Sequence, residues 1–497
     1  MKTRWIASIT ASGVAVGALA VGVASAGTLP PDTSGGGTTA PADTAAPASD
    51  ISAPVTSAGA GSAGVLVSDA GFGTDGALTV NVNDAGHDRF ISVATGADGS
   101  AYASGFVDVG DGDHAFLVTK FTADGVLDDS YGDGGSAIVN VVVDGGDAEV
   151  ARGLVVADDG SVTIAGPADH DPAAAAPDDG DADAAVIRLD PTGALDATFG
   201  DGGIAIFDFG AGKAVDAETY LADNAWGLAA RDSGYVVFAS TPNQEADRVD
   251  TDFVVAGVTG TGELDEAFGE AGTVVVDVNS AVDNARRIKV DDQGRVVAVG
   301  YSRDGDGIVS PTLIRLTPDG DLDETFGEGG VANHIVLDAV TEAYNVAFQG
   351  DDYVMSGYGH DADSETVDQV TYRFTADGAW DESFGDGGVT RIDFANQDDR
   401  GRDVATLPDG SIVVVGSGKL DETNLDGLVV LLDAEGAPVA GFGDNGTQLT
   451  DLGGANDALF GVNVSADGST VYVAGYKGGA TDTDEQDDAV LLRFTVG

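Results

Sequence analysis

The chain has 497 residues, 84 acidic against 22 basic side chains, a formal net charge of −62 and no cysteine. So strong a negative charge repels nucleic acid and anionic membranes, and the lack of cysteine excludes a disulfide framework and a lipoprotein attachment site. The acids are spread along the whole chain. They therefore fit a solubility or high-salt role more simply than one cation site, with Ca²⁺ binding as the functional alternative.

The N-terminus predicts an export signal over residues 1–26. Lys2 and Arg4 form a basic start, an apolar run follows, and residues 24–26 supply a small-x-small cleavage site. The alternative is an uncleaved anchor, which the many alanines and glycines of this run disfavour. Residues 27–64 are rich in Pro, Thr, Ala, Ser and Gly. They predict a disordered linker, because they offer too little apolar surface to bury.

A short phrase of the form Leu-Asp-x-x-Phe-Gly-Asp-Gly-Gly recurs along the rest of the chain. Its aromatic residue occurs seven times, at Phe72, Tyr131, Phe199, Phe268, Phe326, Phe384 and Phe442. The last four copies follow one another at intervals of 58 residues. A near-fixed period of this length means that one supersecondary unit is repeated, so residues 65–497 are predicted to form one repeat domain.

Each unit is predicted to contain four short antiparallel strands. In the sixth copy we expect them over residues 388–394, 402–407, 411–416 and 427–432, separated by turns rich in Asp and Gly. Four such strands form one blade of a β-propeller. The first copy begins with an outer strand, and the last copy ends without one. The predicted fold is therefore an all-β, seven-bladed propeller of four-stranded antiparallel blades. It closes by pairing the N-terminal outer strand with the three C-terminal strands, which removes two exposed edges.

The repeated phrases resemble the delta-60 repeat family of bacterial β-propeller proteins, a family of unknown function. The resemblance is carried by residues 127–135, 195–203 and 322–330, each followed by a strand and a valine-rich hairpin. The first and last copies keep Phe-Gly but lose Leu-Asp. The resemblance covers about residues 65–497. It implies a propeller and implies no reaction, cofactor or catalytic residue.

An acidic residue recurs 15 or 16 positions after the aromatic in most copies. The set, with the third member placed by its longer loop, is Asp88, Asp147, Asp223, Asp283, Glu342, Asp399 and Asp457. In a propeller these acids would surround one mouth of the central channel, where they could hold a hard cation through oxygen ligands. The structural alternative, which repetition in every blade favours, is that each acid caps the backbone amides of its own turn.

The second and third copies carry extra residues, in loops expected on adjacent blades. Loops on a rigid frame are common binding sites, and an aromatic ring beside carboxylates can stack on a sugar. The candidate ligand-binding residues are Tyr220, Trp226, His170 and Asp171. For Trp226 the alternative is inner-strand core. A further candidate metal group begins like an EF-hand loop but lacks its later Gly and Glu, and consists of Asp179, Asp181 and Asp183.

These features predict a secreted or cell-surface acidic propeller that acts as an extracellular binding module. The expected partner is a protein or a glycan, the expected state is a monomer, and Ca²⁺ is the candidate stabilising ion. Two alternatives stay open: a carbohydrate- or ester-processing hydrolase with its site at the channel mouth, and a cell-surface structural protein. No nucleophile motif occurs in its required strand–turn–helix setting, so no catalytic residue is predicted. No transmembrane segment is expected after signal cleavage.

Overall fold

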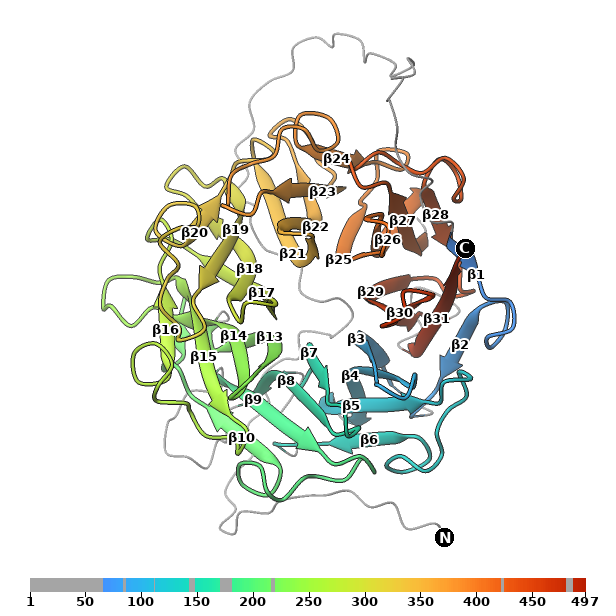
Figure 1. The fold of residues 1–497 in the computed structure, drawn as a ribbon, viewed down its shortest axis with the longest axis horizontal. Coiled ribbons are helices and arrows are strands. Elements are labelled where there is room, and N and C mark those ends of the chain that lie inside the picture. The colour runs from blue at the N-terminus through green and yellow to red at the C-terminus, as the bar shows by residue number, and fades with distance from the viewer. Residues whose placement is uncertain are drawn as a thin grey trace.

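The computed structural model describes residues 66–83, 86–110, 112–142, 148–169, 181–215, 220–421, 424–479 and 486–497. Every helix or strand position in these ranges is a β-strand (Figure 1). Within the same ranges, no helix has the length and apolar character needed to cross a membrane. The predicted signal peptide and the predicted linker lie outside the described residues.

Most strands form antiparallel groups of four. The first group is β3 (Asp88–Thr95), β4 (Ala101–Gly110), β5 (Asp113–Phe121) and β6 (Ser136–Val139). The second is β7 (Gly153–Val156), β8 (Val162–Asp169), β9 (Ala182–Leu189) and β10 (Ile204–Phe207). The third is β13 (Asn224–Arg231), β14 (Gly234–Pro242), β15 (Thr251–Thr259) and β16 (Thr273–Val276). A two-stranded hairpin, β11 (Lys213–Ala214) and β12 (Tyr220–Leu221), lies between the second and third groups in sequence.

The fourth group is β17 (Asp283–Val290), β18 (Val296–Arg303), β19 (Val309–Leu316) and β20 (Val331–Asn333). The fifth is β21 (Val340–Gln349), β22 (Asp352–His360), β23 (Asp368–Phe374) and β24 (Val389–Ile392). One parallel pair, Val309 with Val340, links these two groups into one eight-stranded sheet. The sixth group is β25 (Arg400–Thr406), β26 (Ile412–Asp421), β27 (Asn424–Leu432) and β28 (Thr447–Thr450). The last combines β29 (Asp457–Val464), β30 (Thr470–Lys477) and β31 (Asp488–Val496) with β1 (Leu66–Ser68) and β2 (Ala77–Val80).

Figure 1 shows these groups arranged in a ring. The strands that face the centre, called inner strands below, are β3, β7, β13, β17, β21, β25 and β29. Each inner strand contacts the inner strand of the next group, and β29 contacts β3. The two ends of the array meet where β2 pairs antiparallel with β31, the pairing that the sequence predicts. Strand β1 pairs with the far end of β31, Leu66 opposite Val496. It precedes the first repeat phrase and was not predicted.

The middle strands of a group are buried on both faces. In β26 and β27 the residues Val413, Val415, Val429 and Leu431 are at most 1 % exposed. Neighbouring groups cover each sheet from both sides, so these strands read as continuous valine and leucine runs rather than as an apolar–polar alternation. The turn between β25 and β26 is tight because Gly410 takes a φ of 90° and Asp409 accepts a hydrogen bond from the Ser411 amide at 2.9 Å.

The repeat phrase forms a buried stack of three side chains. In the fourth group Phe326 is fully buried, and the Arg315 guanidinium lies over its ring at 4.4 Å. Arg315 also pairs with Asp323 at 2.8 Å, while the other oxygen of Asp323 accepts the Thr325 amide. The aspartate of the phrase therefore fixes an arginine on the phrase's aromatic ring. Equivalent stacks occur at Phe72, Phe199, Phe268 and Phe384.

Candidate functional site

Each inner strand begins next to a residue that accepts hydrogen bonds from the preceding turn. We call these seven residues the junction residues: Asp88, Glu149, Asp223, Asp283, Thr341, Asp399 and Asp457. Asp399 is typical, since Oδ2 accepts the Phe394 amide at 2.6 Å and Oδ1 accepts the Lys419 amide at 3.1 Å. Every junction residue is fully buried or nearly so. They satisfy backbone amides that would otherwise be buried without partners.

Two junctions differ from the sequence prediction. In the second group the position belongs to Glu149, whose two oxygens accept the amides of Val141 and Val142; the predicted Asp147 lies outside the described residues. In the fifth group Thr341 takes the position and accepts the Leu337 amide at 3.1 Å. Glu342, the predicted residue, is buried one position further along, 3.7 Å from the Arg286 guanidinium. The search for an acid at constant spacing passed over a threonine that does the same work.

At four junctions the junction aspartate belongs to a cluster of three carboxylates. One member comes from the third strand of a group, one follows that group's outer strand, and the junction residue begins the next group. The clusters are Asp183–Asp208–Asp223, Asp252–Asp277–Asp283, Asp368–Asp393–Asp399 and Asp426–Asp451–Asp457. Within each, one oxygen per residue lies within 4.8 Å of the others. Each cluster therefore connects two neighbouring groups, and none contains two junction residues.

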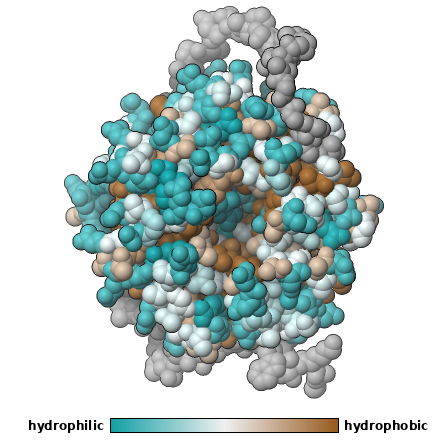
Figure 2. Space-filling model, in the orientation of Figure 1, coloured by the Kyte–Doolittle hydropathy of each residue, from teal (hydrophilic) through white to brown (hydrophobic). Residues whose placement is uncertain are grey.

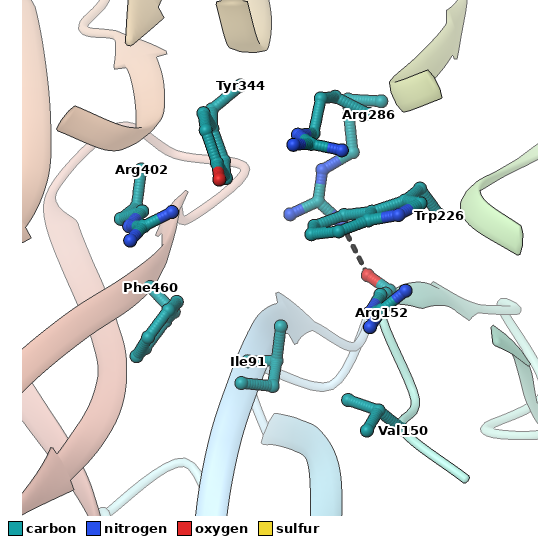
Figure 3. A pocket seen from close by; sticks show the side chains of 9 residues that line it. Ile91, Val150, Arg152, Trp226, Arg286, Tyr344, Arg402 and Phe460 are labelled. Atoms are coloured by element: carbon teal, nitrogen blue, oxygen red, sulfur yellow. Dashed lines mark hydrogen bonds between the residues drawn. The ribbon is translucent and has the colours of Figure 1, made fainter. Parts of the chain in front are cut away.

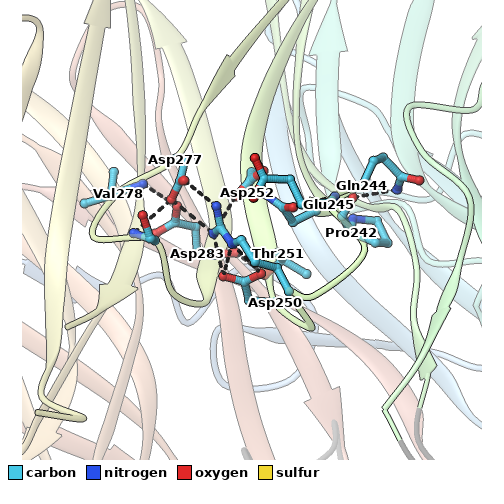
Figure 4. Close-up of polar contacts among 12 residues, drawn as sticks. Pro242, Gln244, Glu245, Asp250, Thr251, Asp252, Asp277, Val278 and Asp283 are labelled. Atoms are coloured by element: carbon cyan, nitrogen blue, oxygen red, sulfur yellow. Dashed lines mark hydrogen bonds and ion pairs between the residues drawn. The ribbon is translucent and has the colours of Figure 1, made fainter. Parts of the chain in front are cut away.

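An arginine already lies in two of these clusters. Arg248 pairs with Asp277 at 2.5 Å and with Asp250 at 2.5 Å, and it lies 3.4 Å from Asp252. Figure 4 shows Asp250, Asp252, Asp277 and Asp283 converging there. In the cluster of Asp368, Arg391 makes the equivalent pair. No ion pair with Lys or Arg is found within the described residues for Asp208, Asp223, Asp451 or Asp457.

Burial of these carboxylates disfavours their charged form. It raises the pKa of Asp283 to about 9 and the pKa values of Asp223 and Asp399 to about 7. The pKa of Asp457 is raised for the same reason. In the described part of the chain, Asp223 Oδ1 and Asp283 Oδ1 are buried without a hydrogen-bond partner. Clustered, desolvated carboxylates are costly when ionised unless a cation lies among them. Three carboxylates also supply the hard oxygen ligands that Ca²⁺ prefers.

The centre of the ring has a different chemistry. Three residues beyond each junction residue, the inner strand directs a side chain inward. These central residues are Ile91, Arg152, Trp226, Arg286, Tyr344, Arg402 and Phe460. In six of the seven strands a β-bulge lies at that position, which explains why the side chain leaves the normal alternation. Figure 3 shows these side chains around a common space.

Arginine and aromatic rings alternate around this centre. The Arg152 guanidinium lies 4.0 Å from the Trp226 ring, and Arg286 lies 4.2 Å from its other neighbour contact with the same ring. Arg286 is also 4.7 Å from the Tyr344 ring, and Arg402 is 4.5 Å from it. Arg402 then approaches Phe460 at 5.6 Å. The stack leaves a cavity of about 30 Å³. Figure 2 shows one face of the ring with a depression at its centre.

The other candidate residues lie away from this centre or outside the described residues. His170, Asp171 and Asp179 lie outside the described residues. Asp181 accepts the Ala182 amide at 3.1 Å, and only Asp183 enters a carboxylate cluster. Tyr220 begins the short strand β12, opposite Ala214. Trp226 is a central residue, so it belongs to the inner-strand core of the ring rather than to an insertion loop.

The alternating centre was missed from the sequence although a signal was present. Arg286, Tyr344, Arg402 and Phe460 follow one another at intervals of 58 residues, each three residues beyond its junction residue. Aligning the copies would have exposed the position. A search for residue types that recur could not, because this position changes from copy to copy while the junction position stays nearly constant.

Two segments of the chain match a family model described as "Domain of unknown function (DUF5122) beta-propeller", over residues 158–199 and 294–326. A search of the curated proteins finds no match.

Solved structures with a similar course of the chain include a protein of unknown function from Dyadobacter fermentans DSM 18053. It is 13 % identical, covers 85 % of this chain and 98 % of its own, and has a TM-score of 0.39. The β-propeller domain of the Trilobed protease from Pyrococcus furiosus is 10 % identical, with coverages of 82 % and 93 % and a TM-score of 0.37. The periplasmic gluconolactonase PpgL of Pseudomonas aeruginosa is 11 % identical, with coverages of 80 % and 96 % and a TM-score of 0.36. The family match and the all-β sheet groups together support a β-propeller family of unknown function.

Proposed function

We propose that the chain is an exported, closed seven-bladed β-propeller of the delta-60 repeat type that works as a binding module. Ca²⁺ held at the carboxylate clusters stabilises the junctions between its blades. The partner is an extracellular protein or a glycan, and the propeller acts as a monomer. Residues 1–26 serve as the signal peptide and residues 27–64 as a linker.

The blade count and the closure are supported by the strand pairing. Each inner strand leads one group of paired strands, and contacts pass from β3 through every inner strand to β29 and back to β3. The pairing of β2 with β31 joins the two ends of the array. A sheet array joined in this way leaves no unpaired blade edge at its ends.

The observation that carries the cation proposal is the use of arginine in two clusters out of four. Arg248 and Arg391 supply a positive charge to the clusters of Asp277 and Asp368. The same arrangement of carboxylates recurs around Asp208 and Asp451. A position that needs a cation in two copies needs one in the others, and three carboxylates from two neighbouring blades suit a divalent ion with oxygen ligands.

The centre supports a binding role over the hydrolase alternative. A hydrolase with its site at the channel mouth needs a substrate-sized pocket with convergent acid and base groups. Arginine and aromatic side chains instead fill the centre and leave about 30 Å³, which is room for about one water molecule.

Thermal unfolding of the full chain at fixed ionic strength tests the cation proposal. We expect a saturable rise in melting temperature with Ca²⁺ that Mg²⁺ does not reproduce, because only the folded chain brings the three carboxylates together. Asp451→Asn should reduce this rise. Asp277→Asn, the matched change in a cluster that holds Arg248, should leave it unchanged.

The converse variant sharpens the test. Arg391→Gln removes the cation from the cluster of Asp368, so it should add a Ca²⁺-dependent rise that the wild type lacks. A response that follows only total salt, or that is the same for Asp451→Asn and Asp277→Asn, would contradict the proposal. Export is tested separately, by mass spectrometry of the N-terminus in medium and cell-wall fractions. An intact Met1 on all of the protein would refute signal cleavage.

A further inference from the structure

The central cavity is lined by positive charge and aromatic rings. Its lining includes four arginines, Arg152, Arg286, Arg287 and Arg402, and no acidic residue among the described ones. This is unexpected in a chain with 84 acids and 22 bases, since chance would place carboxylates beside most arginines. The residues of the lining come from inner strands of different groups, so the charge is concentrated by the closure of the ring rather than by one loop.

Arg402 is the residue whose charge is least compensated. Within the described part of the chain, its guanidinium makes no ion pair, and its Nε is buried without a hydrogen-bond partner. The rings of Tyr344, Tyr358 and Phe460 lie around it at 4.5, 5.3 and 5.6 Å. Cation–π contacts offset part of the desolvation of a guanidinium, but ring faces accept no strong hydrogen bond.

The acids nearest the cavity are committed elsewhere. Glu342 lies 3.7 Å from Arg286, and Asp403 lies 3.9 Å from Arg287. Asp403 also accepts the Val462 amide at 2.9 Å. These two acids therefore lie beside other arginines and leave Arg402 facing the cavity with a positive charge and unused N–H donors.

We propose that the central cavity binds one small inorganic anion of halide size, held by Arg402 with the help of the neighbouring arginines. The cavity of about 30 Å³ has room for about one water molecule, and a halide ion is of similar size, whereas a sugar or a nucleotide phosphate is larger. A buried guanidinium with free donors favours a charged acceptor over water. The anion would fasten inner strands of several blades to one another. This site is independent of the Ca²⁺ clusters.

Anomalous diffraction from crystals of the full chain grown in bromide tests the site directly. We expect one anomalous peak in the cavity, within hydrogen-bond distance of the Arg402 guanidinium. Density without an anomalous signal at that place would mean water only and would overturn the proposal. This measurement needs no variant and so does not depend on how well a variant folds.

Melting in chloride and in gluconate, at equal ionic strength and with chelator present, gives the solution counterpart. Gluconate is too large for the cavity, so we expect chloride to raise the melting temperature saturably by about 1–3 °C. Arg402→Met should abolish this difference. Arg400→Met is the control, because Arg400 is partly exposed beside Asp398 and does not line the cavity. Equal chloride effects in both variants would refute binding at Arg402.

Discussion

The junctions and the centre of the ring are built three residues apart on the same strands, yet they differ in almost every respect. The junction position is an acid in six copies and a threonine in the seventh, and it accepts backbone amides. The central position carries isoleucine, arginine, tryptophan, tyrosine or phenylalanine. The junctions gather negative charge between neighbouring blades, and the centre gathers positive charge from all of them.

The difference shows how a repeat protein separates structure from specificity. A residue that serves its own backbone turn has the same task in every copy, so it recurs. A residue that faces the axis meets its counterparts from other copies, so its task depends on what they are, and identical residues would fail. Seven arginines would repel one another, and seven aromatic rings would leave no polar group. Alternation resolves both problems.

Removing the largest ring from the centre should have the largest effect. Trp226→Ala deletes the ring that lies between Arg152 and Arg286, at 4.0 and 4.2 Å. The lost packing and cation–π contacts should lower the free energy of unfolding by about 3–5 kcal/mol. Chemical denaturation measures it. Trp226→Phe keeps an aromatic face and should lose less than half as much. Equal losses would show that stacking with arginine is unimportant.

At the junctions the cost should follow the number of amides left without a partner. Asp399→Ala orphans the amides of Phe394 and Lys419, whereas Thr341→Ala orphans only that of Leu337. We expect losses of about 2–4 kcal/mol and about 1–2 kcal/mol respectively in unfolding free energy. If Thr341→Ala were the more damaging change, threonine would not be the equivalent of the junction acids.

The sequence predicts most of the frame because the frame repeats. The sixth copy's strands were expected over 402–407, 411–416 and 427–432 and are observed as β25 (Arg400–Thr406), β26 (Ile412–Asp421) and β27 (Asn424–Leu432). The junction acids were identified in five copies of seven. What failed depends on register: an acid at constant spacing selected Glu342, but the pairing of Ala343 with Gly357 places Thr341 at the junction.

The site residues were harder to predict, for a physical reason. The carboxylate clusters combine residues from three strands of two blades, and only the junction member has a constant spacing from the repeat phrase. The central side chains depend on bulges, which a sequence does not reveal by itself. Spacing along the chain carries information about one strand, and these sites are made between strands.

The pH dependence of stability should distinguish a junction acid that lacks a cluster. Burial raises the pKa of Glu149 to about 8, so its protonated form is the stable one in the fold. Its contribution is complete below the unfolded pKa and is lost as the pH rises through about 8. Glu149→Gln does not titrate. Its unfolding free energy should therefore gain on that of the wild type by on the order of 2 kcal/mol between pH 5 and 9.

The control for this titration is a junction acid with a smaller shift. Burial raises the pKa of Asp88 only to about 6, so the gain of Asp88→Asn over the wild type should be complete at lower pH. Stability differences that stay flat from pH 5 to 9 for both variants would show that these acids are ionised throughout.

The smallest effect is expected from a single hydroxyl at the centre. Tyr344→Phe keeps the ring between Arg286 and Arg402 but removes the hydroxyl that lies 3.4 Å from the Tyr358 hydroxyl. A bond of this length is weak, so we expect a loss of about 0.5 kcal/mol in unfolding free energy. A loss as large as that of Trp226→Ala would mean that hydrogen bonding, not stacking, holds the centre together.

Calorimetric titration of the metal-free full chain with Ca²⁺ tests the central claim most directly. Four carboxylate clusters are present, and arginine lies in two of them, so the account predicts saturable binding of about two Ca²⁺ ions per chain. In Arg391→Gln the number should rise to about three. No saturable heat in the wild type, or a number of sites unaffected by that variant, would contradict it.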